Sequence, residues 1–197
     1  MLRDGLGDLG RLDEAQLIDA YIRKTARYSV SGPLVLGALL ADAPPATCEA
    51  LARFGDLLGL GYQLQNDLDA LHADIETGEH SDLDTGKRTF PLWLAYQRLD
   101  ATQRALMEAV VHEPASLARR RRLLSLITNS GALPLVRQRI KALRREALQV
   151  LDEAPLHPRE RRGFLEIANL ILGPHGPRSS QKQPIATLAT AESRPMH

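Results

Sequence analysis

The chain has 197 residues, of which 44% are hydrophobic and 25% are charged. This composition is enough for one domain with one core, and it argues against disorder throughout. The 25 basic and 24 acidic residues leave a formal net charge of +1, so no global field attracts nucleic acid or an anionic membrane. A single cysteine, Cys48, excludes an intramolecular disulfide and a cysteine-cluster zinc site.

No uncharged stretch is longer than the fourteen residues of 28–41, which are interrupted by glycine and proline. A membrane span needs about 20 apolar residues, so no transmembrane segment is expected. The first residues also lack the apolar core of a signal peptide. These features predict a cytoplasmic protein with no nucleic-acid partner.

Helical periodicity predicts an all-α fold. A first helix over about 13–30 places Leu17, Ile18, Tyr21 and Ile22 on one face, with Asp13 as its N-cap. The further helices are expected, in chain order, after Pro33 and over about 48–74, 91–99, 101–111, 114–128, 132–151 and 157–172. Residues 75–88 are polar and contain two glycines, which predicts a loop.

The predicted helical domain covers residues 1–172. Residues 173–197 are rich in proline, glycine and serine, which is typical of a disordered tail. Basic residues gather at 119–122, four arginines in a row, and again at 137–145. We interpret them as the solvated faces of two helices. A nucleic-acid patch is disfavoured because no aromatic side chains are interleaved for base stacking.

A polar face occurs inside the long helix. At about 100° per residue, Gln63, Asn66, Asp67 and Ala70 fall on one side, and Asp74 returns to it if the helix continues. Carboxylate and amide oxygens are the ligands that Mg²⁺ prefers. The same spacing is also typical of a helix that emerges from the core with its polar residues in water. Spacing alone leaves both interpretations open.

Two further segments carry polar chemistry. Residues 82–91 place Gly86 beside Lys87 and Arg88, with Thr89 following. Donors of this kind can surround a phosphate, although the spaced glycines of a Walker A loop are missing. The other segment, residues 24–26 (Lys-Thr-Ala), lies within the first helix and has little meaning by itself.

Together these segments resemble the C-terminal half of trans-isoprenyl diphosphate synthases, the polyprenyl synthetase family. The resemblance covers about residues 9–99. The matched motifs are, in chain order, Lys-Thr-Ala at 24–26, a glycine–alanine helix at 37–41, Phe-Gly-x-x-Leu-Gly at 54–59, the aspartate-rich motif at 62–70, and Asp-Leu-x-x-Gly-Lys-x-Thr-x-Pro at 82–91.

The resemblance implies an isoprenoid-synthase-type helical bundle that condenses isopentenyl diphosphate with an allylic diphosphate, using Mg²⁺. Lys24 and Lys87 would contact the diphosphate. Thr25 would lie at the reacting carbons, and Gln63 would face the allylic chain. Asp67 would be the principal metal-site carboxylate, with Asn66 and Asp74 as further candidate ligands.

The chain also departs from the family pattern. Asn66 replaces the first aspartate of the matched motif, Ala70 replaces the last, and no Asp-Asp pair occurs in the sequence. The family's first aspartate-rich motif lies well upstream of Lys-Thr-Ala, and only 23 residues precede Lys24. We therefore expect a bundle truncated at its N-terminus, with an exposed apolar surface and a homo- or hetero-oligomeric state.

Two classes of function remain open at this point. One is a prenyltransferase that is inactive, or only weakly active, as this short chain. The other is a non-catalytic remnant or regulatory partner of a full-length prenyl synthase. Product length and the allylic primer are not fixed by these residues.

Overall fold

The computed structural model describes residues 9–76, 83–84 and 87–173, and for residues 72–76 it describes the backbone alone. The residues it describes form helices and turns and include no strand, which confirms the predicted all-α fold. The proposed tail after Gly173 and most of the predicted loop at 75–88 lie outside the described residues.

The described elements are, in chain order, α1 (Glu14–Tyr21), the π-helix η1 (Ile22–Ser31), α2 (Gly32–Leu40), α3 (Pro45–Glu76), α4 (Phe90–Arg98), α5 (Ala101–Val111), α6 (Leu117–Asn129), α7 (Ala132–Glu153) and α8 (Pro158–Leu172). In that described part, no helix is both long and apolar enough to cross a membrane.

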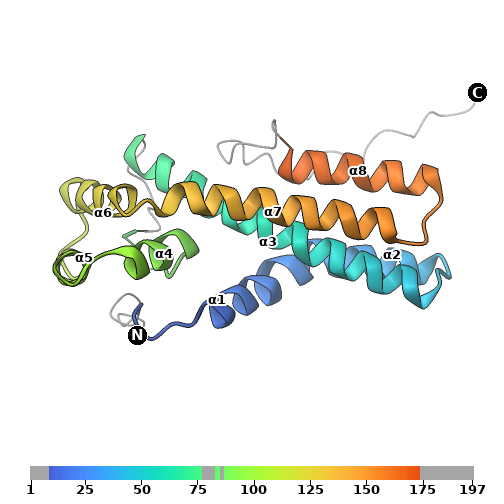
Figure 1. The fold of residues 1–197 in the computed structure, drawn as a ribbon, viewed down its shortest axis with the longest axis horizontal. Helices are drawn as coiled ribbons and strands as arrows, with labels where there is room; N and C mark the ends of the chain where they lie inside the picture. The colour runs from blue at the N-terminus through green and yellow to red at the C-terminus, as the bar shows by residue number, and fades with distance from the viewer. Residues whose placement is uncertain (1–8, 77–82, 85–86, 174–197) are drawn as a thin grey trace, which may run out of the picture.

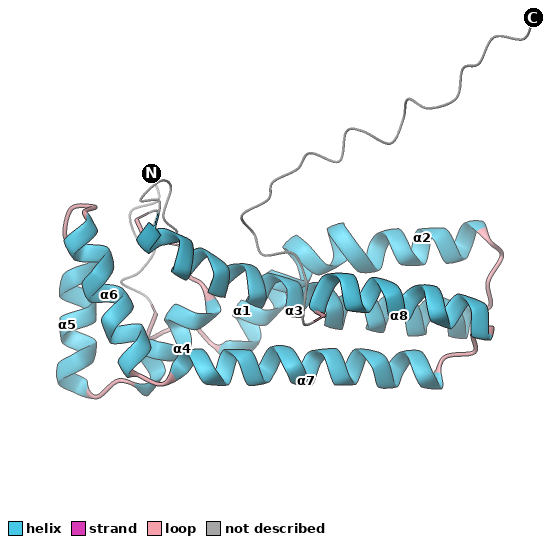
Figure 2. Ribbon diagram, turned by 90° about the horizontal axis from the view of Figure 1, so that it is seen from above, coloured by secondary structure: helices cyan, strands magenta, loops and turns pink. Residues whose placement is uncertain are grey.

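The bundle is built around α3. Figure 1 shows α3 and α7 running along the long axis of the molecule, and α3 packs most extensively on α7 and η1. Helices α4, α5 and α6 gather at one end, whereas α2 and α8 lie toward the other end, as Figure 2 also shows. Because α3 runs between both ends, it aligns the two halves.

The core follows the apolar stripe of α3. Phe54 and Leu58 are fully buried in a cluster with α7 and α8. Leu64, Leu68 and Leu71 are buried in a second, larger cluster with α4, α5, α6 and the first half of α7. Their spacing of three to four residues is the helical period predicted from the sequence.

Side-chain caps fix the N-terminal ends of α5 and α6. Asp100 caps α5 by accepting a hydrogen bond from the Gln103 N–H at 2.8 Å, and Gln103 Oε1 accepts from the Asp100 N–H in return. Ser116 caps α6 by accepting from the Arg119 N–H at 3.1 Å. The sequence predicted that this helix begins at Pro114. The Ser116 cap explains why α6 begins at Leu117 instead.

The first helix is the main correction to the predicted secondary structure. Residues 13–30 were expected to form one α-helix, with a break before Pro33. The chain is instead helical without a break from Glu14 to Leu40, and residues 22–31 within it are π-helical. The Gly32 N–H closes this segment by donating to the Arg27 carbonyl, five residues back. Long π-helical segments are rare, so propensity alone predicts an α-helix.

Two glycines of α3 let η1 approach closely. A Cβ built on Gly59 would lie 2.4 Å from the Ala26 Cα, and one on Gly55 would lie 2.5 Å from the Ser31 Cα. Distances this short leave no room for any side chain. Ser31 adds a hydrogen bond to Asp56 Oδ1 at 2.6 Å. The glycines of the Phe-Gly-x-x-Leu-Gly segment are therefore explained by this helix contact.

The outer face of α2 is apolar and exposed. Leu36, Leu39 and Leu40 project outward, and Leu40 is 79% exposed. Nearby Tyr28 of η1 is also exposed. Contiguous apolar surface on a small domain is typical of a contact with another segment or chain. The expected exposed apolar surface is thus present, whereas the oligomeric state stays a prediction.

The glycine contact yields a stability prediction. Gly59→Ala should lower the free energy of unfolding by about 1–3 kcal/mol, because the new methyl group forces η1 away from α3. Gly37→Ala in α2 is the matched control, because a Cβ there meets nothing within 4 Å. It should raise stability by about 0.5–1 kcal/mol through helix propensity. Urea unfolding measures both changes, and a Gly59→Ala protein as stable as the parent would contradict the packing argument.

Candidate functional site

The centre of the predicted site is Asp67, which is only 4% exposed. Both of its carboxylate oxygens accept hydrogen bonds. Gln63, one turn earlier on α3, donates from Nε2 to Oδ1 at 2.8 Å. The hydroxyl of Tyr21, at the end of α1, donates to Oδ2. A buried carboxylate needs such partners, because an unpaired charge is costly to remove from water.

Gln63 also links α3 to η1. Its Oε1 accepts a hydrogen bond from the Thr25 hydroxyl at 2.8 Å. The two ends of the Gln63 amide therefore contact different groups, Thr25 and Asp67, and this fixes the orientation of the amide. The structure brings together the predicted residues Thr25, Gln63 and Asp67. It also gives Gln63 a contact with Asp67 that the sequence did not predict.

Tyr21 is a site residue that the sequence reasoning missed. It was placed on the apolar face of the first helix, and its half-buried side chain does pack against the larger core cluster. Its hydroxyl, however, accepts a hydrogen bond from the Phe90 N–H at 2.8 Å in addition to contacting Asp67. Tyr21 precedes Thr25 by four residues, and residues with that spacing are neighbours on one face of a helix. This spacing was the signal in the sequence that could have placed Tyr21 beside the site.

The two predicted lysines lie next to this network in the sequence. Lys24 immediately precedes Thr25, and Lys87 lies three residues before Phe90; both side chains are exposed. Thr89 ends the segment as the N-cap residue of α4, whose N1/N2 positions include Pro91. The Phe90–Tyr21 bond thus fixes the end of the Lys87 segment near Asp67.

Asp67 and Asn66 fit a Mg²⁺ ion that takes its remaining ligands from a substrate phosphate and water. Asp67 supplies a carboxylate, and half-buried Asn66 beside it supplies an amide. Each carboxylate oxygen has two lone pairs and can accept more than one contact. Mg²⁺ is commonly held by one or two carboxylates, several waters and substrate phosphates.

A metal cage built from protein groups alone is not indicated. Among the residues whose side chains are described, no group of three or more histidine, cysteine, aspartate or glutamate side chains converges. The third predicted ligand, Asp74, belongs to α3, but its side chain lies outside the described residues.

The prediction that the arginine run is solvated was wrong for its first two members. Arg119 is 3% exposed, and its guanidinium is buried among backbone carbonyls and Asp84. Arg121 and Arg122 are exposed, as predicted. The periodicity of α6 explains the difference, because Arg119 shares the buried face with Leu123 and Ile127.

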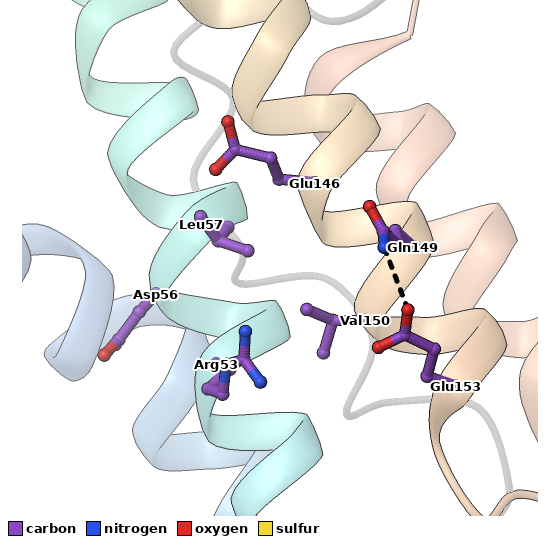
Figure 3. Close-up of a pocket in the computed structure, with 7 residues that line it drawn as sticks. All are labelled: Arg53, Asp56, Leu57, Glu146, Gln149, Val150 and Glu153. Atoms are coloured by element: carbon purple, nitrogen blue, oxygen red, sulfur yellow. Dashed lines mark hydrogen bonds between the residues drawn. The ribbon is translucent and has the colours of Figure 1, made fainter.

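A separate hollow of about 330 Å³ lies between α3 and α7. Figure 3 shows Arg53 of α3 opposite Glu146 and Glu153 of α7, with Asp56 pointing toward the neighbouring helix. Gln149 donates a hydrogen bond to Glu153 at 2.9 Å. The lining carries three carboxylates and one guanidinium. Its acidic character disfavours a diphosphate, and it contains none of the predicted site residues.

The chain is similar to known proteins. The polyprenyl synthetase family model matches residues 6–127. An all-trans-nonaprenyl-diphosphate synthase (geranyl-diphosphate specific) from Rhodobacter capsulatus is 30% identical over 122 residues, which cover 60% of this chain and 37% of that protein.

Two solved structures are also similar. A geranylgeranyl pyrophosphate synthase from Corynebacterium glutamicum, complexed with isoprenyl diphosphate and magnesium, is 28% identical with a TM-score of 0.69, covering 83% of this chain and 48% of that one. A polyprenyl synthase from Caulobacter crescentus CB15, complexed with calcium and isoprenyl diphosphate, is 28% identical with a TM-score of 0.70, covering 87% and 52%.

This chain therefore spans about half the length of those two solved structures, and 37% of the Rhodobacter relative. The family match, in contrast, extends over well more than half of this chain. It also includes every element of the Asp67 network, from Tyr21 to Phe90. The protein belongs to the polyprenyl synthetase family.

Proposed function

We propose that the network around Asp67 is the diphosphate-binding, Mg²⁺-dependent part of a prenyl transfer site, where isopentenyl diphosphate condenses with an allylic diphosphate. The observation that carries this proposal is the hydrogen-bond chain from Thr25 through Gln63, Asp67 and Tyr21 to Phe90. It joins three sequence motifs that are distant along the chain. The similar Corynebacterium enzyme was solved with isoprenyl diphosphate and magnesium, which supports the ligand class.

The proposed chemistry begins with cleavage of the allylic C–O bond. The bonding electron pair leaves with the diphosphate, and the resulting allylic cation is attacked by the double bond of isopentenyl diphosphate. A proton is then lost from the new chain. Bound Mg²⁺ supplies positive charge that stabilises the departing diphosphate. Lys24 and Lys87 add point charges to the phosphate oxygens, and the buried Asp67 is a metal ligand held in place by Gln63 and Tyr21.

A non-catalytic role is the second candidate, and a specific observation favours it. Asn66 and Ala70 replace two acidic positions of the family motif, so the described side chains give this helix face one carboxylate, Asp67. Less negative charge weakens the hold on Mg²⁺, which loses its waters reluctantly. A protein that binds a diphosphate without turnover fits this arrangement. So does a protein that binds a full-length synthase as a regulatory partner. Both proposals place the protein in the cytoplasm.

Ligand binding tests the site assignment. Calorimetry with geranyl diphosphate should show binding that depends on Mg²⁺. Lys87→Ala or Lys24→Ala should weaken it about 10- to 100-fold, because each removes a charge-assisted contact worth about 1.5–3 kcal/mol. Lys141→Ala, on the exposed face of α7, is the matched control and should bind like the parent. Unchanged affinity in both site variants would reject the assignment.

Turnover separates the two candidate functions. Labelled isopentenyl diphosphate, with geranyl or farnesyl diphosphate as primer, should give little or no acid-labile product with residues 1–197 alone, because the described side chains give this helix face one carboxylate. Robust incorporation that Lys87→Ala abolishes would show that the chain is an active synthase. Binding without incorporation would favour the non-catalytic role.

The Tyr21 contact gives a further prediction. Tyr21→Phe keeps the ring in the core but removes the hydroxyl shared by Asp67 and Phe90. Groups that orient a metal ligand typically change metal affinity by 10- to 100-fold, so binding of Mg²⁺ with inorganic diphosphate should weaken by a factor of about that size. Tyr28→Phe is the control, because Tyr28 lies on the adjoining π-helix η1 and is 81% exposed. Equal binding by the parent and Tyr21→Phe would exclude a role for this hydroxyl.

A further inference from the structure

Arg119 connects two parts of the chain that are distant in sequence. Its Nε donates to the Val110 carbonyl at 3.1 Å, and its Nη2 donates to the Val111 carbonyl at 2.8 Å. On the other side, Nη1 lies 3.1 Å from both the Leu83 carbonyl and Asp84 Oδ1. One planar guanidinium therefore holds the end of α5 and the pair Leu83–Asp84.

The α5 side of this contact is rigid. Val110 and Val111 form the last turn of α5, and both side chains are buried in the larger core cluster. Carbonyls in the last turn of a helix lack partners within it and carry the negative end of its dipole. A buried guanidinium satisfies these carbonyls, and the Asp84 carboxylate balances its charge.

The loop side is held by a second arginine. The Nε of Arg120 lies 2.8 Å from Asp84 Oδ2, so two successive arginines pair with the two oxygens of one carboxylate. Three residues beyond Asp84 is Lys87, and three residues further is Phe90, whose N–H donates to Tyr21. Asp84 is thus held by α6, and Phe90 is held by the Asp67 network.

We propose that Arg119 is a positioning residue for diphosphate binding. By holding Leu83 and Asp84 in place, it positions Lys87 near Asp67. The proposal rests on the function proposed above, because it takes Lys87 as a diphosphate contact. Arg119 itself does not touch the ligand. Because Asp84 and Phe90 are held before an anion binds, less conformational entropy is lost on binding. These two held positions limit where the ammonium group of Lys87 can go.

Arg119→Lys tests the geometry apart from the charge. Lysine keeps the positive charge but loses the planar fork that reaches four acceptors at once. Binding of inorganic diphosphate with Mg²⁺ should weaken about tenfold, and amide hydrogen exchange should accelerate in the segment 83–90. Exchange in α3 and α7 should stay as in the parent. Arg121→Ala, an exposed arginine on the same helix, is the matched control and should change neither measurement.

Asp84→Asn approaches the same contact from the loop and tests the proposal if Arg119→Lys fails to fold. It should show the same faster exchange at 83–90 and weaker diphosphate binding. If the parent protein binds no diphosphate, the proposed function fails. If the parent binds and both variants bind equally well, the function stands and the positioning role is overturned. Faster exchange throughout the chain would likewise overturn it, because Arg119 would then serve the fold in general.

Discussion

The close approach of η1 to α3 is the contact on which the site depends. Gly55 and Gly59 are four residues apart on α3, and they face Ser31 and Ala26, which are five residues apart on η1. A repeat of four is about one turn of an α-helix, and a repeat of five is about one turn of a π-helix. The π-helical segment therefore keeps its small residues in register with the glycines.

The polar network follows from that register. Thr25 is adjacent to Ala26, so the contact at Gly59 places its hydroxyl beside Gln63, one α-helical turn further along α3. Gln63 then contacts Asp67 on the next turn. A chain of hydrogen bonds at about 2.8 Å tolerates little displacement. The glycines thus determine more than packing, because they set the distance between the segment that carries Lys24 and the carboxylate of α3.

The sequence predicted the parts of the structure that depend on local patterns. The helices 101–111 and 158–172 have caps and periodicity that can be read directly, and the order of the polar motifs led to Thr25, Gln63 and Asp67. Features that depend on distant partners were missed or wrong. Arg119 looked like surface charge because its acceptor Leu83 lies 36 residues away. Tyr21 looked apolar because its polar partners are 46 and 69 residues away. The π-helix depends on the contact between η1 and α3. The helix propensity of residues 22–31 carries no information about that contact.

The burial of Arg119 and the exposure of Lys24 and Lys87 divide the charges of this region into two classes. Mobile ions in the solvent screen exposed charges over about 8–10 Å at ordinary ionic strength, but they screen buried pairs much less. Added salt should therefore weaken the attraction of the lysines for an anion while the Arg119–Asp84 pair keeps its strength. The protein would then keep Leu83 and Asp84 in place even in conditions that leave the proposed anion-binding lysines with little electrostatic attraction for a ligand.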